Sequence, residues 1–158
     1  ACLIVNPLIR ARRAERVLVV APETLAVQWL GELWRKYHQV FVLLDEARLA
    51  DVERDFGPGF NPFDAHRRAV IGLDTLTARP KLTEQAVAAG IDLLIVDEAH
   101  RLRRPPGHPG EPAYRAIAPI AAASGATSTL PSASTRSASP MQRSAGTSGA
   151  SRGSAIRS

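Results

Sequence analysis

The sequence predicts an α/β domain built on a mainly parallel sheet, and two patterns support this class. Short runs of aliphatic and β-branched residues alternate with segments of helical periodicity, an order typical of βαβ units. The runs are continuously apolar, as in strands that helices cover on both faces. Four such runs are present, at residues 16–21, 40–44, 69–73 and 91–96.

The first helix is predicted from about Glu23 to Tyr37, with Pro22 suited to its first turn. Apolar residues recur there at three- and four-residue spacing and form one stripe, so both tryptophans are expected in the core. The stripe consists of Leu25, Trp29, Leu30, Leu33, Trp34 and Tyr37.

Two further helices are predicted after the third strand. One spans Lys81 to Ala89, because Gly90 provides a C-terminal stop before the fourth strand. The other spans Ala113 to Ala123, and Pro119 is expected to bend or interrupt it.

Length and composition limit the class of protein. A chain of 158 residues with 45% hydrophobic residues has enough apolar surface for one core. A single cysteine, Cys2, excludes a disulfide framework and a cysteine-rich zinc site, and indicates a reducing compartment. No apolar run approaches the roughly 20 residues that cross a bilayer, so we expect a cytoplasmic protein without membrane partners.

The composition changes sharply at Ser124 and predicts two regions, a folded part over residues 1–123 and a tail over 124–158. The tail has 11 serines in 35 residues, four arginines and no acidic residue. Such a segment buries too little apolar surface to offset its ordering entropy, so disorder is predicted. Without the tail, the net charge of +5 falls to 16 basic against 15 acidic residues. Charge alone therefore does not indicate a nucleic-acid partner.

The clearest chemical signal is the pair Asp97 and Glu98, which follows the apolar run at residues 91–96. Ligands of open α/β sheets bind outside the carboxyl ends of strands. Mg²⁺ takes one or two carboxylates together with waters and phosphate oxygens. Asp97 would hold the hydrated metal, Glu98 would orient or deprotonate water, and His100 would link the nucleotide state to a neighbouring motif. The structural alternative is a solvated acidic turn.

Three segments in order support a family resemblance. Asp-Glu-Ala-His at 97–100 resembles motif II of superfamily 2 helicases. Residues 16–33 look like motif Ia of Swi/Snf-type ATPases, especially the bacterial RapA (HepA) branch, and residues 60–64 and 69–76 resemble the same branch. The resemblance covers essentially residues 1–123. It implies a RecA-like first lobe that uses ATP and Mg²⁺ and acts on double-stranded DNA, with RNA polymerase or another nucleoprotein complex as partner, at the bacterial nucleoid.

The same resemblance implies where DNA would bind. Pro22, Glu23 and Thr24 would open a helix whose N-terminus faces the DNA backbone, and Asp74 and Thr75 would touch the same strand. Unpaired N–H groups and the helix dipole favour a phosphate at such a position. The alternative is an ordinary strand-to-helix turn in which Thr24 caps the helix.

The sequence departs from the family at both ends. Phosphoryl transfer in this class requires a Gly-Lys-Ser/Thr loop, and the only lysines are Lys36 and Lys81, neither of which follows glycine. By family order the loop is expected before Ala1, with Cys2 to Ile9 in the following helix. At the other end the serine-rich tail replaces the expected strand with a Ser/Thr-Ala-Thr motif. We favour a reading-frame shift as its origin, although a genuine linker gives the same composition.

Two functions from different classes follow. The first is a truncated first ATPase lobe of a DNA translocase. Alone, this chain is expected to be inactive and only marginally stable. The second is a degenerate, non-catalytic remnant that at most binds DNA or a protein partner. An unrelated hydrolase or Rossmann enzyme is disfavoured, because Gly-x-Ser-x-Gly and Gly-x-Gly-x-x-Gly are both absent.

Overall fold

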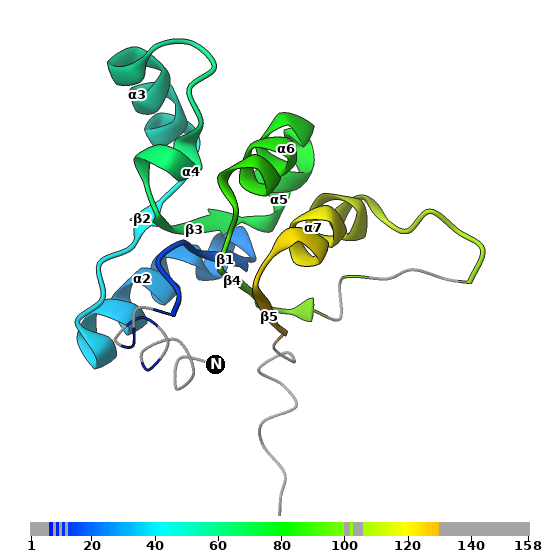
Figure 1. Ribbon diagram of the computed structural model, residues 1–158, viewed down its shortest axis with the longest axis horizontal. Coiled ribbons are helices and arrows are strands. Elements are labelled where there is room, and N and C mark those ends of the chain that lie inside the picture. Colours follow the sequence, from blue (N-terminus) through cyan, green and yellow to red (C-terminus); the bar gives the residue numbers. More distant parts are fainter. Residues whose placement is uncertain are drawn as a thin grey trace, which may run out of the picture.

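A five-stranded parallel sheet forms the centre of the computed structural model, which describes residues 7, 9, 11, 13–99, 102 and 106–129. The strands lie in the order β2-β3-β1-β4-β5, with helices on both faces (Figure 1). The predicted α/β class is therefore confirmed. The strands are β1 (Val17–Ala21), β2 (Val42–Leu43), β3 (Arg68–Gly72), β4 (Leu93–Val96) and β5 (Ala126–Thr129).

The sheet divides the core into two layers, and helices cover both of them. One face of the sheet packs on α2 (Glu23–Tyr37), and β1 contributes Val17, Val19 and Ala21 to this layer. Leu18 and Val20 point to the opposite layer, as the alternation of a strand requires. The helices of that layer are α3 (Glu46–Phe56), α4 (Pro62–Ala65), α5 (Leu73–Ala78), α6 (Pro80–Ala89) and α7 (Pro112–Ala123). Within the described residues, no helix is long and apolar enough to span a membrane.

Helix α2 has the predicted bounds, but one of its tryptophans lies outside the core. Ala26, Trp29 and Leu33 are buried, whereas the side chain of Trp34 is 55% exposed. Successive helical residues are rotated by about 100°, so Trp34 points about 140° away from Trp29. The prediction that both tryptophans are core residues is thus wrong for Trp34. Its ring instead lies edge-on to His38, with centroids 6.2 Å apart.

The predicted helices near the C-terminal side are present with small differences. Helix α6 starts at Pro80, one residue before the prediction, and ends before Gly90, which has a left-handed φ of 72°. Helix α7 continues past Pro119 to Ala123, so the proline does not interrupt it. Pro119 is exposed, where solvent can hydrate the carbonyl that a proline leaves without a donor.

Strand β5 lies within the segment for which disorder is predicted. Ala126–Thr129 pairs in parallel with β4, and Gly125 makes the close turn before it, with its N–H 3.2 Å from the carbonyl oxygen of Ile91. The predicted boundary at residue 124 is therefore too early, and the strand expected to be missing beside β4 is present. Its Thr and Ser side chains are mostly exposed, so the strand does not need an apolar pattern. The backbone pairing with β4 holds it in the sheet.

Two predicted segments fall mostly or wholly outside the described residues. Residues 130–158, the remainder of the predicted tail, are not described. Of the helix expected over Cys2 to Ile9, only Pro7 and Ile9 are described, and both are helical.

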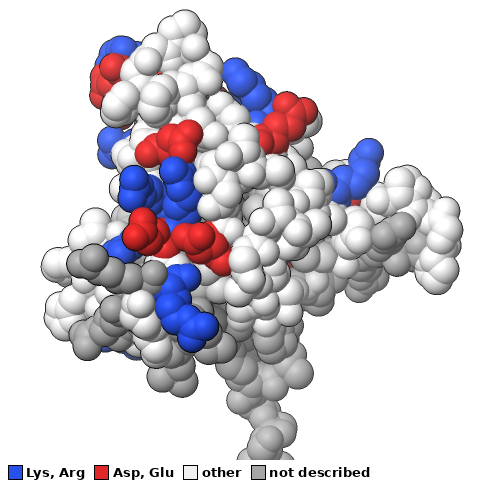
Figure 2. Space-filling model, in the orientation of Figure 1, with Lys and Arg blue, Asp and Glu red and all other residues white. Residues whose placement is uncertain are grey.

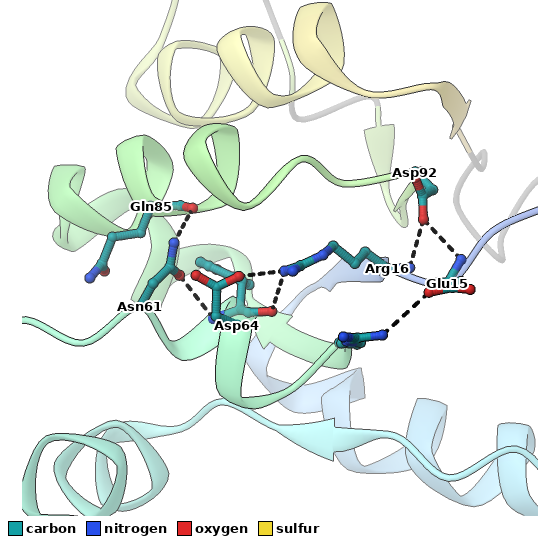
Figure 3. A network of polar contacts seen from close by, with 8 residues as sticks. Glu15, Arg16, Asn61, Asp64, Gln85 and Asp92 are labelled. Carbon is teal, nitrogen blue, oxygen red and sulfur yellow. Dashed lines mark hydrogen bonds and ion pairs between the residues drawn. The ribbon is translucent and has the colours of Figure 1, made fainter. Parts of the chain in front are cut away.

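A polar network ties together the amino ends of the strands (Figure 3). The Oδ2 atom of Asp92, just before β4, accepts the backbone N–H groups of Glu15 and Arg16 at 2.9 and 2.8 Å. The Arg16 guanidinium donates to the Phe63 carbonyl at 3.1 Å and to the Asp64 carboxylate at 2.6 Å. The network therefore connects β1, β4 and α4 at the edge of the sheet opposite the predicted site.

Candidate functional site at the carboxyl edge of the sheet

The sheet register brings the predicted site segments to one edge. Ala21, the last residue of β1, is level with Gly72 of β3, and Val20 is level with Val96 of β4. Residues 22–24 therefore follow β1, residues 73–75 follow β3 and residues 97–98 follow β4. In the sheet, β1 lies between β3 and β4. This edge is where open α/β sheets bind ligands.

Asp97 is held in a fixed position at this edge. Its side chain is 8% exposed, and its backbone N–H donates to the Val20 carbonyl at 2.8 Å, which extends the β1–β4 pairing. Its Oδ2 atom accepts the indole N–H of Trp29 at 2.8 Å, and its Oδ1 atom accepts the N–H of Glu98 at 3.0 Å. Both oxygens are thus oriented by donors that carry no charge.

Glu98 occupies an uncommon backbone conformation. Its φ of 56° lies in the left-handed region, which costs a non-glycine residue roughly 1–2 kcal/mol. The turn directs the chain away from β4 immediately after Asp97, and Glu98 is half-buried there. Strained positions of this kind are concentrated at functional sites.

Glu23 and Thr75 form a second polar contact at this edge. Oε1 of Glu23 accepts the N–H of Thr75 at 3.0 Å and its hydroxyl at 2.6 Å, so α2 and α5 are joined where both helices begin. The Glu23 carboxylate lies directly over Gly72, where a Cβ atom would overlap it. A side chain at position 72 would therefore displace the Glu23 carboxylate from Thr75.

The remaining predicted DNA-facing residues surround this contact. Thr24 and Asp74 are exposed, and Pro22 is half-buried. No side chain caps α2, because Pro22 precedes its first residue, so the alternative role of Thr24 as the helix cap does not apply. Glu23 is engaged by Thr75, and a carboxylate repels phosphate, so Glu23 fits a role in positioning Thr75 better than direct contact with DNA. His100 lies outside the described residues.

The surface charge in Figure 2 is mixed. On the face shown there, basic and acidic side chains lie next to each other in small groups between α4 and α2, and most of the face carries neither. This face therefore offers no continuous basic patch for a nucleic acid. The near balance of charge predicted for residues 1–123 agrees with this view.

The donor set at Asp97 fits a hydrated Mg²⁺ ion. In the described part of the chain, each carboxylate oxygen accepts one hydrogen bond and so keeps a further lone pair, and no Arg or Lys forms an ion pair with Asp97. Among the described residues, no group of three or more His, Cys, Asp or Glu side chains could hold a metal.

Sequence reasoning missed two residues of this edge, Trp29 and Gly72. Trp29 was expected only as part of the apolar stripe, yet its indole N–H reaches a carboxylate 68 residues later in the chain. The available signal was chemical, because a buried tryptophan usually needs a partner for its N–H. Gly72 stands at the end of an apolar run. Apart from the glycine itself, nothing in the sequence indicates that the Glu23 carboxylate lies over this position.

Known proteins of similar sequence are RNA polymerase-associated proteins. The sequence matches none of the known protein-family profiles. It is 44% identical over 103 residues to the RNA polymerase-associated protein RapA of Pasteurella multocida, a match that covers 65% of this chain and 11% of the relative. It is 39% identical over 143 residues to RapA of Actinobacillus succinogenes, covering 90% of this chain and 14% of the relative.

A solved structure gives the same indication for the fold. The SWI2/SNF2 ATPase core of Sulfolobus solfataricus, in complex with double-stranded DNA, superposes with a TM-score of 0.59 at 17% identity. The match covers 79% of this chain and 23% of that chain. The chain thus spans 11–14% of the length of its RapA relatives and less than a quarter of the solved core. In sequence the chain is therefore similar to one region of the RapA proteins, and its fold is similar to part of a SWI2/SNF2 ATPase core.

Proposed function

We propose that this chain supplies the carboxylates and the DNA-facing helix start of an ATP-driven DNA translocase of the RapA type. The observation that carries the proposal is the position of Asp97, fixed at the carboxyl end of β4 by two uncharged donors, the indole N–H of Trp29 and the backbone N–H of Glu98. The DNA-facing residues proposed from the family, at 22–24 and 74–75, lie on the same edge of the sheet.

In this proposal the two acidic residues have different tasks. Asp97 would hold a hydrated Mg²⁺ ion through its carboxylate, which Trp29 and Glu98 keep oriented. Glu98 accepts a proton from the attacking water on its carboxylate, with the strained turn directing its position. When bound, Mg²⁺ neutralises charge on the phosphates of ATP. His100 would relay the nucleotide state to a neighbouring motif.

The partners are proposed from the relatives. RapA is named as an RNA polymerase-associated protein, and the solved SWI2/SNF2 core was in complex with double-stranded DNA. We propose double-stranded DNA and RNA polymerase, or another nucleoprotein complex, as partners in the cytoplasm. DNA would meet the N-terminus of α2 at Pro22 and Thr24, and the start of α5 at Asp74 and Thr75.

A second candidate function rests on a specific feature of the sequence. Gly-Lys-Ser/Thr does not occur in these 158 residues, so the chain itself has no loop to hold the phosphates of ATP. A non-catalytic remnant that binds DNA or a protein partner would share this feature. The two candidates differ in whether Asp97 and Glu98 support ATP hydrolysis when a Gly-Lys-Ser/Thr loop and the rest of a RapA-type enzyme are supplied.

A chimera tests this difference. Residues 16–99 of this chain would replace the matching segment of Pasteurella multocida RapA, and DNA-stimulated ATP hydrolysis would be measured. We expect turnover close to that of the parent, reduced at least about 100-fold by Glu98→Gln, as expected when a general base is removed. Glu84→Gln, an exposed acidic residue on α6, is the matched control and should leave turnover unchanged. A folded chimera without turnover would favour the remnant.

A further inference from the structure

Trp29 is the residue through which α2 contacts the metal-binding carboxylate. Its side chain is 8% exposed and belongs to the core layer under the sheet, with Ala26 and Leu33 as neighbours on the same helix face. Its Nε1 atom donates to Oδ2 of Asp97 at 2.8 Å in a buried hydrogen bond. A side chain from a packed helix therefore sets the direction of a side chain at the end of β4.

This contact does more than satisfy a buried N–H group. A backbone carbonyl would satisfy the indole equally well, whereas Asp97 is the residue proposed to hold the metal. The N–H of Glu98 fixes the other carboxylate oxygen, so rotation of the Asp97 side chain is restricted from two different segments. Both donors are neutral, so neither of them forms an ion pair with the carboxylate.

Helix α2 also contacts the proposed DNA-facing residues. Glu23 in its first turn binds Thr75, and Trp29 lies six residues further along, about 9 Å in the helix direction. One continuous helix thus contacts Thr75 from its first residue and Asp97 from a residue less than two turns later. A displacement of its start would carry the indole donor with it.

We propose that Trp29 is a positioning residue, which orients Asp97 for the metal and connects that carboxylate to the DNA-facing start of α2. The proposal rests on the proposed function, because it takes Asp97 as the metal-binding group. Trp29 itself touches neither the metal nor the nucleotide. Its role is exerted entirely through the hydrogen bond to Oδ2 of Asp97.

The two tryptophans of this protein allow the hydrogen bond to be tested without a metal. In a ¹H–¹⁵N spectrum of the full chain, Trp34→Phe identifies the indole signal of Trp29. We expect that signal to move upfield in Asp97→Asn, because a hydrogen bond to a neutral amide is weaker than one to a carboxylate. The signal of Trp34, which is 55% exposed, should stay in place. An unchanged Trp29 signal would overturn the inference whatever the metal does.

Titration with Mn²⁺ alone then tests the metal role. Paramagnetic broadening should affect the Trp29 indole signal before that of Trp34, and Asp97→Asn should abolish the difference. Equal broadening of both signals would overturn the metal-binding role of Asp97, and with it the positioning role of Trp29. It would leave the hydrogen bond itself established by the first test, so the two failures are distinguishable.

Substitution of Trp29 completes the test. Trp29→Phe keeps an aromatic ring but removes the donor, and we expect about tenfold weaker Mn²⁺ binding by electron paramagnetic resonance, as when a group that orients a metal ligand is lost. Trp34→Phe is the matched control and should not change the affinity. Equal affinities in both variants would contradict the proposal. If Trp29→Phe fails to fold, the ¹H–¹⁵N spectra of Asp97→Asn and the Mn²⁺ titration still test the proposal, because Trp29 is present in both.

Discussion

The two edges of the sheet use the same kinds of side chain in different ways. At the amino edge, Asp64 pairs with Arg16, and Glu15 pairs with Arg67 at 3.3 Å, so acidic groups meet guanidinium groups. At the carboxyl edge, Asp97 and Glu23 accept hydrogen bonds from uncharged donors. The first arrangement joins strands and helices to one another. The second holds carboxylates in place through uncharged donors, which suits the metal-binding role proposed for Asp97.

The largest effect is expected at the carboxyl edge, from Gly72→Ala. The backbone of Gly72, with φ −70° and ψ 139°, suits any residue, so the cost comes from moving the Glu23 carboxylate rather than from the backbone. The added Cβ would displace the Glu23 carboxylate and break its bonds to Thr75. We expect a loss of about 3 kcal/mol in the free energy of unfolding, measured with urea.

A double-mutant cycle makes this prediction specific. With Glu23→Ala present, Gly72→Ala should become neutral or slightly stabilising, because alanine reduces the entropy of the unfolded chain. A cost that persists in that background would show that the close approach of Glu23 does not explain the glycine.

At the amino edge, Asp92→Ala should destabilise the protein by about 2 kcal/mol. The substitution leaves the backbone N–H groups of Glu15 and Arg16 without their acceptor, and Arg16 is partly buried. Asp92→Asn is the matched control, since its amide oxygen can still accept, and it should cost less than half as much. Urea unfolding of the two variants measures the difference, and equal losses would indicate that charge rather than hydrogen bonding matters there.

The smallest effect concerns pH and His66, which precedes β3 at the amino edge. Burial, together with the charge of Arg48, lowers the pKa of His66 below its usual value of 6.5. The folded state therefore disfavours the protonated ring. The contribution of His66 to the free energy of unfolding is fully present above pH 6.5, and it is lost as the pH falls through the lowered pKa. We expect His66→Gln to lose less stability than the parent between pH 7.5 and pH 5, as urea unfolding at both values would measure. Equal losses would contradict the assignment.

The local pattern of the sequence was sufficient for the main elements. The apolar runs gave four of the strands, and the stripe on α2 gave that helix with its observed bounds. Helix α3 was not predicted, because six of its eleven residues are charged and only Leu49 and Val52 are buried. Strand β5 was not predicted because its Ser and Thr residues resemble the tail, and its pairing with β4 is a long-range interaction that composition does not report.

The candidate site was predictable to the same degree. Asp97 and Glu98 could be placed at a strand end from the run that precedes them, and the parallel sheet puts them on the edge that also carries residues 22–24 and 74–75. The contacts between these segments could not be predicted. The pairing of Trp29 with Asp97 and of Glu23 with Thr75 depends on how α2 docks against the sheet, and no local pattern records that geometry.

The central position of β1 determines when this protein can fold during its synthesis. Val17 pairs with Arg68 on one side and with Leu93 on the other, so β1 is synthesised well before either of the strands that flank it. Until β4 has emerged, the apolar strand β1 has an unpaired edge, and long-range parallel pairing is slow to form. Nascent chains stalled before residue 96 should therefore be the ones that chaperones bind.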